Sequence, residues 1–348
     1  MMNAETKDVL CKAQEIYMNC ADELSKTIYM DKVLYAVSGD ERYIYKLVED
    51  SISNLSRRLG AIESCKKIVI YGAGANLEII FAICQNRNIS ISYICDRDVN
   101  KQGKKYNNIL IISPDDLIKE HLDASVIIST TSYLKEVKSF LKQYFSEEQI
   151  IPVADEKQID YIKMQYFDDI VKLEDGEVFV DGGCFDFGTS KVLLGKCKAE
   201  KIYAFEPDPA NLEKVEAEVK KMGISNVDII PAGMWDCNTT LHFNSQGSIM
   251  SSVDENGEDE IKVVAVDEIV DGKVTFIKMD IEGSELKALR GAEKTIKKYR
   301  PKLAICIYHK LEDIIDIPAY IHSLVPEYKF YVRHYSFGPA ETVLYAIV

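Results

Sequence analysis

The chain has 348 residues with 56 acidic and 42 basic side chains, so its formal net charge is −14. This length is enough for two domains with separate cores, and an apolar fraction of 47% is that of an ordinary globular protein. The excess of negative charge, which no lysine- or arginine-rich block offsets, argues against nucleic acid as a partner and disfavours binding to an anionic membrane surface.

The cellular location is predicted from the apolar runs and the cysteines. No apolar run reaches the ~20 residues that a membrane span needs, and the first residues lack the basic and apolar segments of a secretory signal. The nine cysteines are scattered without a C-x-x-C pair. Free thiols in a reducing compartment explain this pattern better than a disulfide framework. We therefore expect a cytoplasmic protein.

Residues 1–64 are predicted to form a helical prefix. Apolar residues recur at helical spacing in two runs, one around Ile16 and one around Leu55, and Gly39-Asp40 separates them as a turn. We expect the apolar stripe to pack on a neighbouring domain. A homodimer through the prefix is the alternative.

Residues 65–154 alternate short apolar runs with helical segments, from KIVIYG to QIIPV. Runs that are buried on both faces and followed by helices predict a small, doubly wound parallel sheet. Ser113 as N-cap with Pro114 in the first turn is a favourable helix start. A polar, helical connector is expected over residues 155–172.

This first α/β domain carries a candidate nucleotide site. Gly72 and Gly74 follow a strand and open a helix whose amides could hold a pyrophosphate, and Asp96 ends the next strand, where it could bind a ribose. Leu77 stands where a dinucleotide-binding loop has its third glycine. A domain that is structural or presents the acceptor is therefore the alternative.

Residues 173–348 repeat the alternation on a larger scale, as a second α/β domain. We expect strands at EVFVDG, KIYAFE, VDII, VTFIKM and PKLAICIY, and helices over residues 210–222, 284–299 and 313–324. A β-rich insertion is predicted over 235–266, with Asn256-Gly257 as a hairpin turn. Two final strands with a short connector predict a Rossmann-like sheet that ends in an antiparallel hairpin.

The first strand of this domain ends in a glycine loop that is a candidate cofactor site. Asp181, Gly182 and Gly183 directly follow the strand, and a glycine at 183 would let the backbone approach a ligand. Asp181 could accept a hydrogen bond from the ammonium group of a bound amino acid. Thr189 and Ser190 open the next helix, where hydroxyls and amides could receive its carboxylate.

The next strand ends place further groups at the same edge. Glu206 stands 25 residues beyond Asp181 and could bind both hydroxyls of a ribose. Gly233 ends the third strand, where the adenine should lie and backbone groups would bind its exocyclic amine. Asp280 ends the fourth strand. An aspartate–glycine loop followed by Glu-Pro one crossover later favours S-adenosylmethionine over a dinucleotide. We therefore predict an S-adenosylmethionine-dependent methyltransferase.

The second domain resembles the FkbM family of methyltransferases. VFVDGG, YAFEPDPANLEKV, IPAGMWD, VVAVDEI, FIKMDIEGSELKALRGA and PKLAICIYHK occur in the family's order over about residues 178–310. The resemblance implies methyl transfer to a hydroxyl of a sugar, polyketide or glycan component. The family commonly has Asp-x-Gly-x-x-x-Gly in its first loop, whereas Phe187 stands here at the last position and Gly188 follows. Either the loop bulges by one residue or the glycine's role is displaced.

His309 and Glu282 are the candidate catalytic residues. His309 follows the fifth strand, and imidazole is suited to accept a proton near neutral pH. We predict it as the general base, with Glu282 as its orienting partner or as the alternative base, and Glu285 as a complement to the helix N-terminus. No metal is predicted. A magnesium site at Asp280 and Glu282 is left as an alternative that lacks a third ligand.

Two other functions remain open at this point. One is an NAD-dependent nucleotide-sugar enzyme that uses the loop at Gly72 and Gly74, and the other is a scaffold that binds S-adenosylmethionine without turnover. The leading prediction is a methyltransferase that acts on a carbohydrate or another small molecule.

Overall fold

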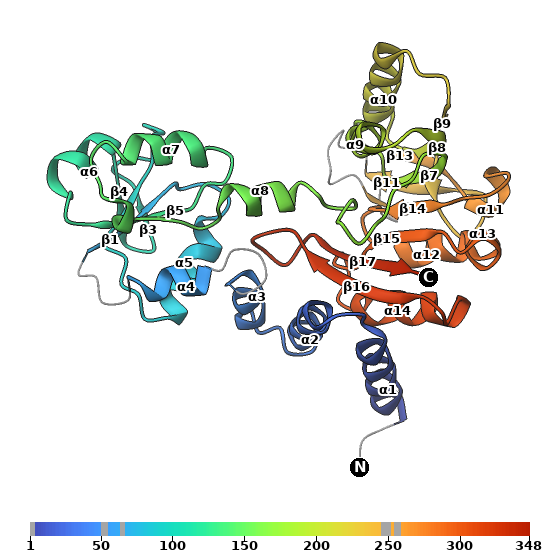
Figure 1. The fold of residues 1–348 in the computed structure, drawn as a ribbon, viewed down its shortest axis with the longest axis horizontal. Coiled ribbons are helices and arrows are strands. Elements are labelled where there is room, and N and C mark those ends of the chain that lie inside the picture. Colours follow the sequence, from blue (N-terminus) through green and yellow to red (C-terminus); the bar gives the residue numbers. More distant parts are fainter. Residues whose placement is uncertain (1–3, 50–54, 63–66, 245–251, 254–258) are drawn as a thin grey trace. The chain divides into compact units, whose positions relative to one another are not determined.

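A computed structural model describes residues 4–49, 55–62, 67–244, 252–253 and 259–348. The predicted hairpin turn at Asn256-Gly257 lies outside the described residues. The chain divides into two compact units. Unit 1 comprises residues 1–37, 164–334 and 340–348, and unit 2 comprises residues 38–163 and 335–339. Both are drawn in Figure 1.

Unit 2 is built on a six-stranded sheet with the order β3-β4-β2-β1-β5-β6. All neighbouring strands pair in parallel except β3 and β4, because apolar runs buried on both faces alternate with helices. Ser113 caps its helix through a capping box, as predicted. The strands are β1 (Ile68–Tyr71), β2 (Tyr93–Cys95), β3 (Lys105–Tyr106), β4 (Ile109–Ile112), β5 (Ser125–Ile128) and β6 (Ile150–Pro152). The helices are α3 (Arg42–Leu47), α4 (Leu55–Gly60), α5 (Leu77–Asn86), α6 (Pro114–Glu120), α7 (Leu134–Leu141) and α8 (Glu156–Ile162).

Unit 1 contains a seven-stranded sheet with the order β16-β17-β15-β14-β7-β8-β9. β17 is antiparallel to both of its neighbours, and the other six strands all run in the opposite direction to it. The prediction of a Rossmann-like sheet that ends in an antiparallel hairpin is therefore confirmed. Its strands are β7 (Glu177–Gly182), β8 (Ala199–Phe205), β9 (Val227–Ile230), β14 (Phe276–Met279), β15 (Lys302–Cys306), β16 (Lys329–His334) and β17 (Thr342–Ile347).

The helices of unit 1 cover both faces of this sheet (Figure 1). Right-handed crossovers that run from β7 toward β9 place helices on one face, and those that run from β14 toward β17 place them on the other. The direction reverses between β7 and β14, so the crevice for a ligand is expected beyond the carboxyl ends of these strands. The helices are α9 (Gly188–Lys196), α10 (Pro209–Met222), α11 (Val266–Ile269), α12 (Glu285–Gly291), α13 (Glu293–Tyr299) and α14 (Asp313–Leu324).

The predicted β-rich insertion forms a small sheet with the order β10-β13-β11-β12. The side chains of Ile261 and Val263 form its apolar core, against which Trp235 and Leu241 pack. Its strands are β10 (Gly233–Met234), β11 (Thr239–Asn244), β12 (Ser252–Val253) and β13 (Asp259–Val264).

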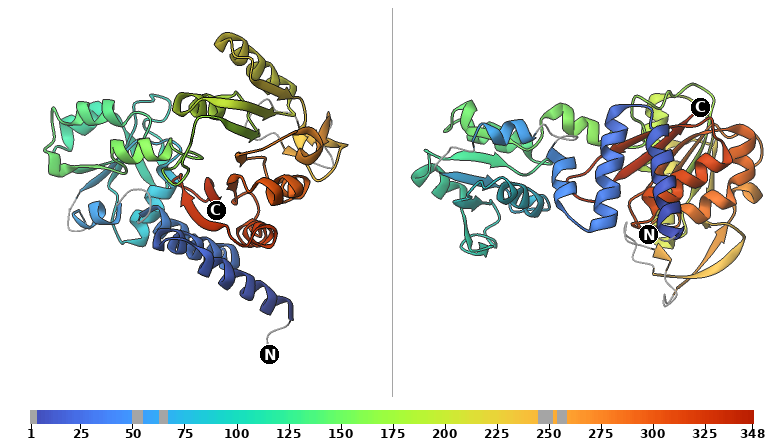
Figure 2. Two further views of the ribbon diagram at one scale, coloured as in Figure 1. Left: turned by 45° about the vertical axis from the view of Figure 1, so that its right-hand side comes forward. Right: turned by 90° about the horizontal axis from the view of Figure 1, so that it is seen from below.

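The helical prefix is divided between the two units, which differs from its predicted boundary at residue 64. Helices α1 (Ala4–Asn19) and α2 (Glu23–Ser38) begin the chain, and α1 packs against α14 and β16 (Figure 2). Ile16 and Cys20 are buried, because this part of the apolar stripe is covered by the same chain. Leu10 is 52% exposed. The remainder of the prefix, α3 and α4, belongs to unit 2.

One arginine joins the start of α2 to the edge strand β16. The guanidinium of Arg333 is nine-tenths buried, donates to both carboxylate oxygens of Asp22 (3.2 and 2.7 Å), and donates to the hydroxyl of Ser25 at 2.9 Å. This arrangement holds the pKa of Asp22 at about 2, since the hydrogen bonds from Arg333 and Ser25 outweigh the effect of burial.

We expect Arg333→Leu to lower the free energy of unfolding of unit 1 by about 3 kcal/mol, because the buried part of Asp22 loses its cation. Urea unfolding followed by circular dichroism measures this loss. The matched control is Arg300→Leu, whose ion pair with Glu327 is about half exposed and which should lose less than ~1 kcal/mol. Equal losses in the two variants would contradict the proposed anchoring role of Arg333.

Candidate active site

The carboxyl ends of four neighbouring strands bring the predicted residues of unit 1 to one edge of the sheet. Asp181 near the end of β7 lies in register with Lys278 of β14, and Gly182 lies in register with Phe205 of β8, which Glu206 follows. Asp280 follows β14, which pairs with β15. We call the loops after β7, β8 and β9 the cofactor half of the site. The acceptor half is formed by the loops after β14 and β15, residues 164–168, and Glu341 directly before β17.

The two glycines after β7 are required by the protein's own packing. Gly183 has a left-handed φ of +72°, and a Cβ there would lie 2.0 Å from the carbonyl oxygen of Asp280. A Cβ on Gly182 would lie 2.4 Å from the Sδ atom of Met234. The close backbone approach predicted at Gly183 is therefore an approach to the loop after β14. It joins the two halves of the site.

The carboxylate of Asp181 has partners within the protein, and its role as an acceptor for the ammonium group of a ligand stays a prediction. Its side chain is completely buried, and its Oδ2 atom accepts the hydroxyl of Ser190 at 2.7 Å. Its Oδ1 atom lies 3.2 Å from Nζ of Lys278. The Ser190 hydroxyl is thus directed at Asp181 rather than at a ligand. Thr189, in the first turn of α9, is partly exposed.

Lys278 was not among the predicted site residues, although it shapes the glycine loop. Its ammonium group is buried in β14 and donates to the carbonyl oxygens of Gly182 and Gly183, at 2.9 and 2.8 Å. Burial opposes its charge, but the neighbouring carboxylates of Asp181 and Asp280 outweigh burial and raise the pKa of Lys278. Lys278 is therefore a buried cation that fixes both carbonyls of the loop.

Phe187 takes the backbone conformation that a glycine would adopt at this position. Its φ is +67°, in the left-handed region, and it directly precedes α9. The glycine's role in the first loop is therefore not displaced to Gly188, whose φ is not positive. The Phe187 ring is completely buried, and this packing offsets the strain of the backbone.

We expect Phe187→Gly to lower the free energy of unfolding by about 2–4 kcal/mol. Removing a buried phenylalanine ring costs about 3–5 kcal/mol, and the relief of the left-handed backbone returns about 1 kcal/mol. Denaturant unfolding of the purified variant measures the difference. Phe185→Gly is the control, because Phe185 has a φ of +53° but a ring that is only half-buried. A Phe187→Gly variant as stable as the wild type would show that the ring does not stabilise the loop.

Glu206 lies at the strand end where a carboxylate is predicted to bind the ribose of the cofactor. Its carboxylate is buried, and each oxygen accepts one backbone amide, from Phe185 and from Asp208, both at 2.9 Å. The side chain of Asn211 also hydrogen-bonds to this carboxylate. Burial raises the pKa of Glu206. Gly233 lies beside Pro207, since a Cβ on Gly233 would be 3.7 Å from the proline ring.

Asp280 receives two tyrosine hydroxyls in the acceptor half. The hydroxyl of Tyr166 donates to its Oδ2 atom at 2.6 Å, and that of Tyr308 donates to its Oδ1 atom at 3.2 Å. The Lys278 ammonium outweighs the effect of burial and lowers the pKa of Asp280, so this carboxylate is ionised. The tyrosines remain neutral donors, because burial raises the pKa of both.

Residues 164–168 and the hairpin before β17 complete the acceptor half, and the sequence did not identify either segment as part of the site. Gln165 donates from Nε2 to the Tyr166 hydroxyl at 2.9 Å and to the carboxylate of Glu341. The Tyr308 hydroxyl lies 3.5 Å from Oε1 of Glu341. The predicted helical connector is helical only over α8, and its remainder carries the Tyr166 side chain to Asp280.

Left-handed backbone conformations gather at this edge of the sheet. Among the described residues other than glycine and asparagine, six have positive φ, and five of these belong to the loops of the site. Such conformations cost about 1–3 kcal/mol each and cluster where function requires a fixed geometry. The five residues are Tyr166, Phe185, Phe187, Glu282 and Glu341.

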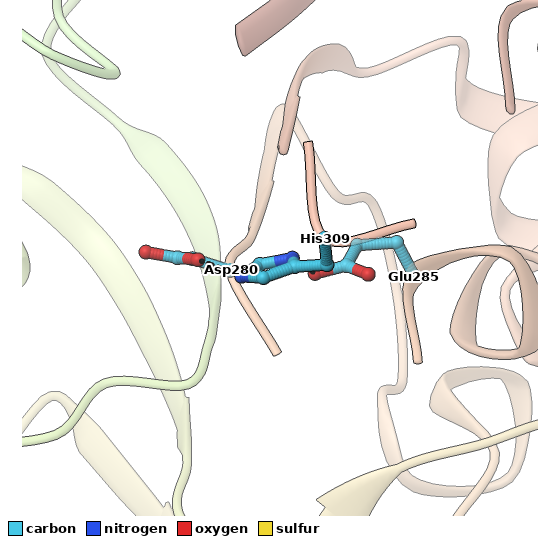
Figure 3. Close-up of side chains that lie close together, drawn as sticks. All are labelled: Asp280, Glu285 and His309. Atoms are coloured by element: carbon cyan, nitrogen blue, oxygen red, sulfur yellow. Dashed lines mark ion pairs between the residues drawn. The ribbon is translucent and has the colours of Figure 1, made fainter. Parts of the chain in front are cut away.

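His309 lies between carboxylates on both sides of its ring (Figure 3). Its Nδ1 atom is 2.9 Å from Oε1 of Glu285, whose side chain is completely buried, and its Nε2 atom is 3.5 Å from both Asp280 and Glu282. The predicted orienting partner, Glu282, is therefore the more distant one. Glu285 orients the imidazole and also accepts the backbone amide of Ile281.

The protonation of His309 and Glu282 favours the alternative that Glu282 is the base. Burial alone would lower the pKa of His309, but its carboxylate neighbours raise it to about 9, so the ring is an imidazolium at neutral pH. Burial raises the pKa of Glu282 to about 7 against the opposing charge of His309. A group with a pKa near the working pH is suited to accept a proton.

Asp280, Glu285 and His309 are the described residues whose ligand atoms are close enough to hold a metal ion. In the structure the Nδ1 atom of His309 lies 2.9 Å from Oε1 of Glu285, which is the separation of an ion pair. A metal ion would need His309 as a neutral imidazole, with a lone pair on the nitrogen that binds it. The absence of a metal stays a prediction, and no step below uses one.

The candidate nucleotide site of unit 2 is also assembled at a sheet edge. Gly72 has a φ of +113°, and the space around Gly74 is open. Asp96 accepts the backbone amide of Ala73 at 2.7 Å, and Lys101 donates to the carbonyl of Ala73 at 3.0 Å. These groups satisfy one another, and nucleotide binding remains a prediction.

The strand order and the glycine loop place unit 1 in the class of Rossmann-like, S-adenosylmethionine-dependent methyltransferases. A crystal structure of a methyltransferase FkbM from Methylobacillus flagellatus KT is similar over 92% of this chain and 99% of its own, with a TM-score of 0.52 and 21% identity. An rRNA methylase from Streptococcus thermophilus (17% identity, 55% of this chain, 92% of its own, TM-score 0.33) is also similar. Fibrillarin from Aeropyrum pernix is similar at 10% identity over 54% of this chain and 74% of its own, with a TM-score of 0.35. The curated proteins include no match.

Residues 181–330 match the methyltransferase FkbM domain, and residues 64–151 match a family described as C2185-like, N-terminal. This chain therefore carries an FkbM methyltransferase domain and is a methyltransferase. The resemblance predicted from the motifs is confirmed. None of the helices among the described residues has the length and apolar character to cross a membrane.

Proposed function

We propose that this methyltransferase transfers a methyl group from S-adenosylmethionine to a hydroxyl group, and that Glu282 accepts the hydroxyl proton. The observation that carries the proposal is the placement of Glu282 in the acceptor half, with its carboxylate 3.5 Å from Nε2 of His309 and half-buried, so that burial raises its pKa to about 7. A hydroxyl must lose its proton when its oxygen is methylated, and Glu282 can accept that proton at neutral pH.

The residues of the cofactor half fit S-adenosylmethionine. Glu206 is a buried carboxylate held by two backbone amides at the position predicted for ribose binding, and Gly233 leaves the space beside Pro207 free of a side chain. The bound molecule supplies a methyl group on a sulfonium, which is electrophilic without further activation. Asp181 and Lys278 hold the glycine loop rather than a ligand.

The chain's own residues supply position and proton transfer. Asp280 is held by Tyr166 and Tyr308 and faces the reacting centre as a fixed negative charge. Glu282 would take the proton of the acceptor hydroxyl as its oxygen bonds to the methyl carbon and the bond from that carbon to sulfur breaks, which leaves S-adenosylhomocysteine as a neutral thioether. The imidazolium of His309 keeps the Glu282 carboxylate available, because its charge lowers the pKa of Glu282.

The acceptor class that we propose is a carbohydrate or another small polyhydroxylated molecule. Neighbouring carboxylates and tyrosine oxygens in the acceptor half can accept hydrogen bonds from several hydroxyls. The family resemblance favours the same class by analogy. An amine acceptor is the alternative, and it would not need a base when it is already neutral.

Turnover tests the proposed function. Purified protein, labelled S-adenosylmethionine and a panel of neutral sugars and glycosides should yield S-adenosylhomocysteine and a labelled acceptor. Labelling of amines alone would contradict a hydroxyl acceptor. Binding of S-adenosylmethionine without turnover on any acceptor would favour the scaffold alternative. Reduction of NAD by the same panel, read at 340 nm, would favour the oxidoreductase alternative.

Location and assembly complete the proposal. All eight cysteines among the described residues are free, which supports a cytoplasmic enzyme. Exposed apolar side chains on α1 and α2, including Met18 at 72% and Val37 at 75%, support a homodimer through these helices. Sedimentation equilibrium would decide between monomer and dimer.

A further inference from the structure

Negative charge exceeds positive charge in the acceptor half of the site. Asp280, Glu282 and Glu341 present three carboxyl groups there, and Glu285 lies behind them. His309 is the cation among them, and it is already in contact with Glu285. An anion that entered this half would therefore meet more carboxyl groups than cations.

Two lysines lie beside the acceptor half, and each has a defined contact. Lys278 is buried, pairs with Asp181, and donates to two carbonyl groups of the glycine loop. The ammonium group of Lys310 donates to the carbonyl of Gly283. The carboxyl groups of Asp280, Glu282, Glu285 and Glu341 still outnumber the cations at this edge, which are His309, Lys278 and Lys310.

Glu341 is the carboxylate of this half that the proposed reaction does not use. It lies directly before β17, has a left-handed φ of +61°, and is partly buried. Its side chain is fixed by Gln165 and lies 3.5 Å from the Tyr308 hydroxyl, which is 3.2 Å from Asp280. A tyrosine hydroxyl has a single proton, so one of these two carboxylates keeps lone pairs for a donor on the acceptor.

We infer that Glu341 is a specificity-determining residue, which selects acceptors whose reacting end is neutral or cationic and rejects acceptors with a carboxylate or phosphate beside the reacting hydroxyl. The inference rests on the proposed function of the same site. Like charges a few ångströms apart in a partly buried site repel by several kcal/mol, which is enough to reject an otherwise matching acceptor.

Matched acceptors test this inference. Neutral methyl glycosides, the corresponding uronic acids and 6-phosphates, and the corresponding amino sugars are offered with labelled S-adenosylmethionine to the wild type and to Glu341→Gln. We expect the wild type to favour the neutral over the anionic member at least about tenfold in kcat/KM. Glu341→Gln should narrow that ratio about tenfold, because the amide removes one like charge and keeps a hydrogen-bonding side chain of the same size.

Glu268→Gln is the matched control, since Glu268 is an exposed carboxylate of α11 whose nearest cation is Lys294. It should leave the ratio unchanged. An unchanged ratio in Glu341→Gln, with binding of S-adenosylmethionine intact as a check of folding, would overturn the inference. A wild type that prefers the anionic member would overturn it too. A wild type that methylates no member of the panel would instead overturn the proposed function, and this inference with it.

Discussion

Glu282→Gln should lower kcat by about 10²–10⁴-fold at neutral pH, because the variant has no group that can accept the acceptor's proton. Glutamine has the size and shape of glutamate, so the loop and the left-handed backbone at this position are expected to remain. The affinity for S-adenosylmethionine should change little, since Glu282 lies in the acceptor half and not beside Glu206. Steady-state kinetics with a calorimetric titration of the same protein separates the two effects.

The pH profile distinguishes Glu282 from His309 as the base. Glu282 must be ionised to accept a proton, so kcat/KM of the wild type should rise about tenfold per pH unit up to about 7 and then level off. If His309 were the base, the rise would continue to about 9, where the imidazolium loses its proton. In His309→Gln the rise of kcat/KM with pH should move to higher pH, because the variant lacks the cation that lowers the pKa of Glu282.

Lys278→Met should lower the free energy of unfolding by about 3–5 kcal/mol at pH 7, because it leaves the completely buried carboxylate of Asp181 without a cation. The glycine loop also loses both hydrogen bonds from the ammonium group to its carbonyls. Denaturant unfolding measures the loss. A decrease below about 1 kcal/mol would contradict the view that this pair holds the loop.

A second variant identifies the unpaired charge as the cause. Lys278→Met combined with Asp181→Asn removes both charges, so the double variant should recover much of the stability that the single variant loses. Lys287→Met is the matched control. Its ion pair with Asp236 is partly exposed, with side chains 45% and 26% accessible, and its loss should cost less than ~1 kcal/mol. A double variant no more stable than Lys278→Met would point to lost packing instead.

The sequence predicted the architecture well, because buried apolar runs indicate the strands and the turns between them indicate their order. VFVDG and FIKM read as strands buried on both faces, and both are central in the sheet of unit 1. The final antiparallel hairpin followed from two strands with a short connector. The predicted boundary at residue 64 differs from the division into compact units, because α1 packs against α14 and β16, which lie some 300 residues further along the chain.

The site was predicted residue by residue only where a strand end fixes the position. Glu206, Asp280 and His309 each follow a parallel strand, and the structure brings all three to one edge. Tyr166 and Glu341 lie in irregular backbone, where neither periodicity nor a turn motif indicates a position. Lys278 did carry a signal, since a lysine inside an otherwise buried strand requires an anionic partner.

The sequence could not show which glutamate orients His309, for a different reason. Glu282 and Glu285 stand three residues apart at the start of a helix. From the sequence, either side chain could contact a residue that follows the next strand. Only the left-handed φ of Glu282 turns its side chain to Nε2 and leaves Glu285 at Nδ1. Phe187 was equally undetermined, because a buried phenylalanine in a glycine conformation follows no local preference.

Calorimetric titration of S-adenosylmethionine into the wild type and into Glu206→Gln tests the central claim most directly. The account predicts one site per chain in the wild type and an affinity at least about tenfold weaker in the variant, because a carboxylate that accepts two hydroxyls is worth more than a neutral amide. A wild type that gives no binding heat at any temperature tested, or a variant that binds as tightly as the wild type, would contradict it.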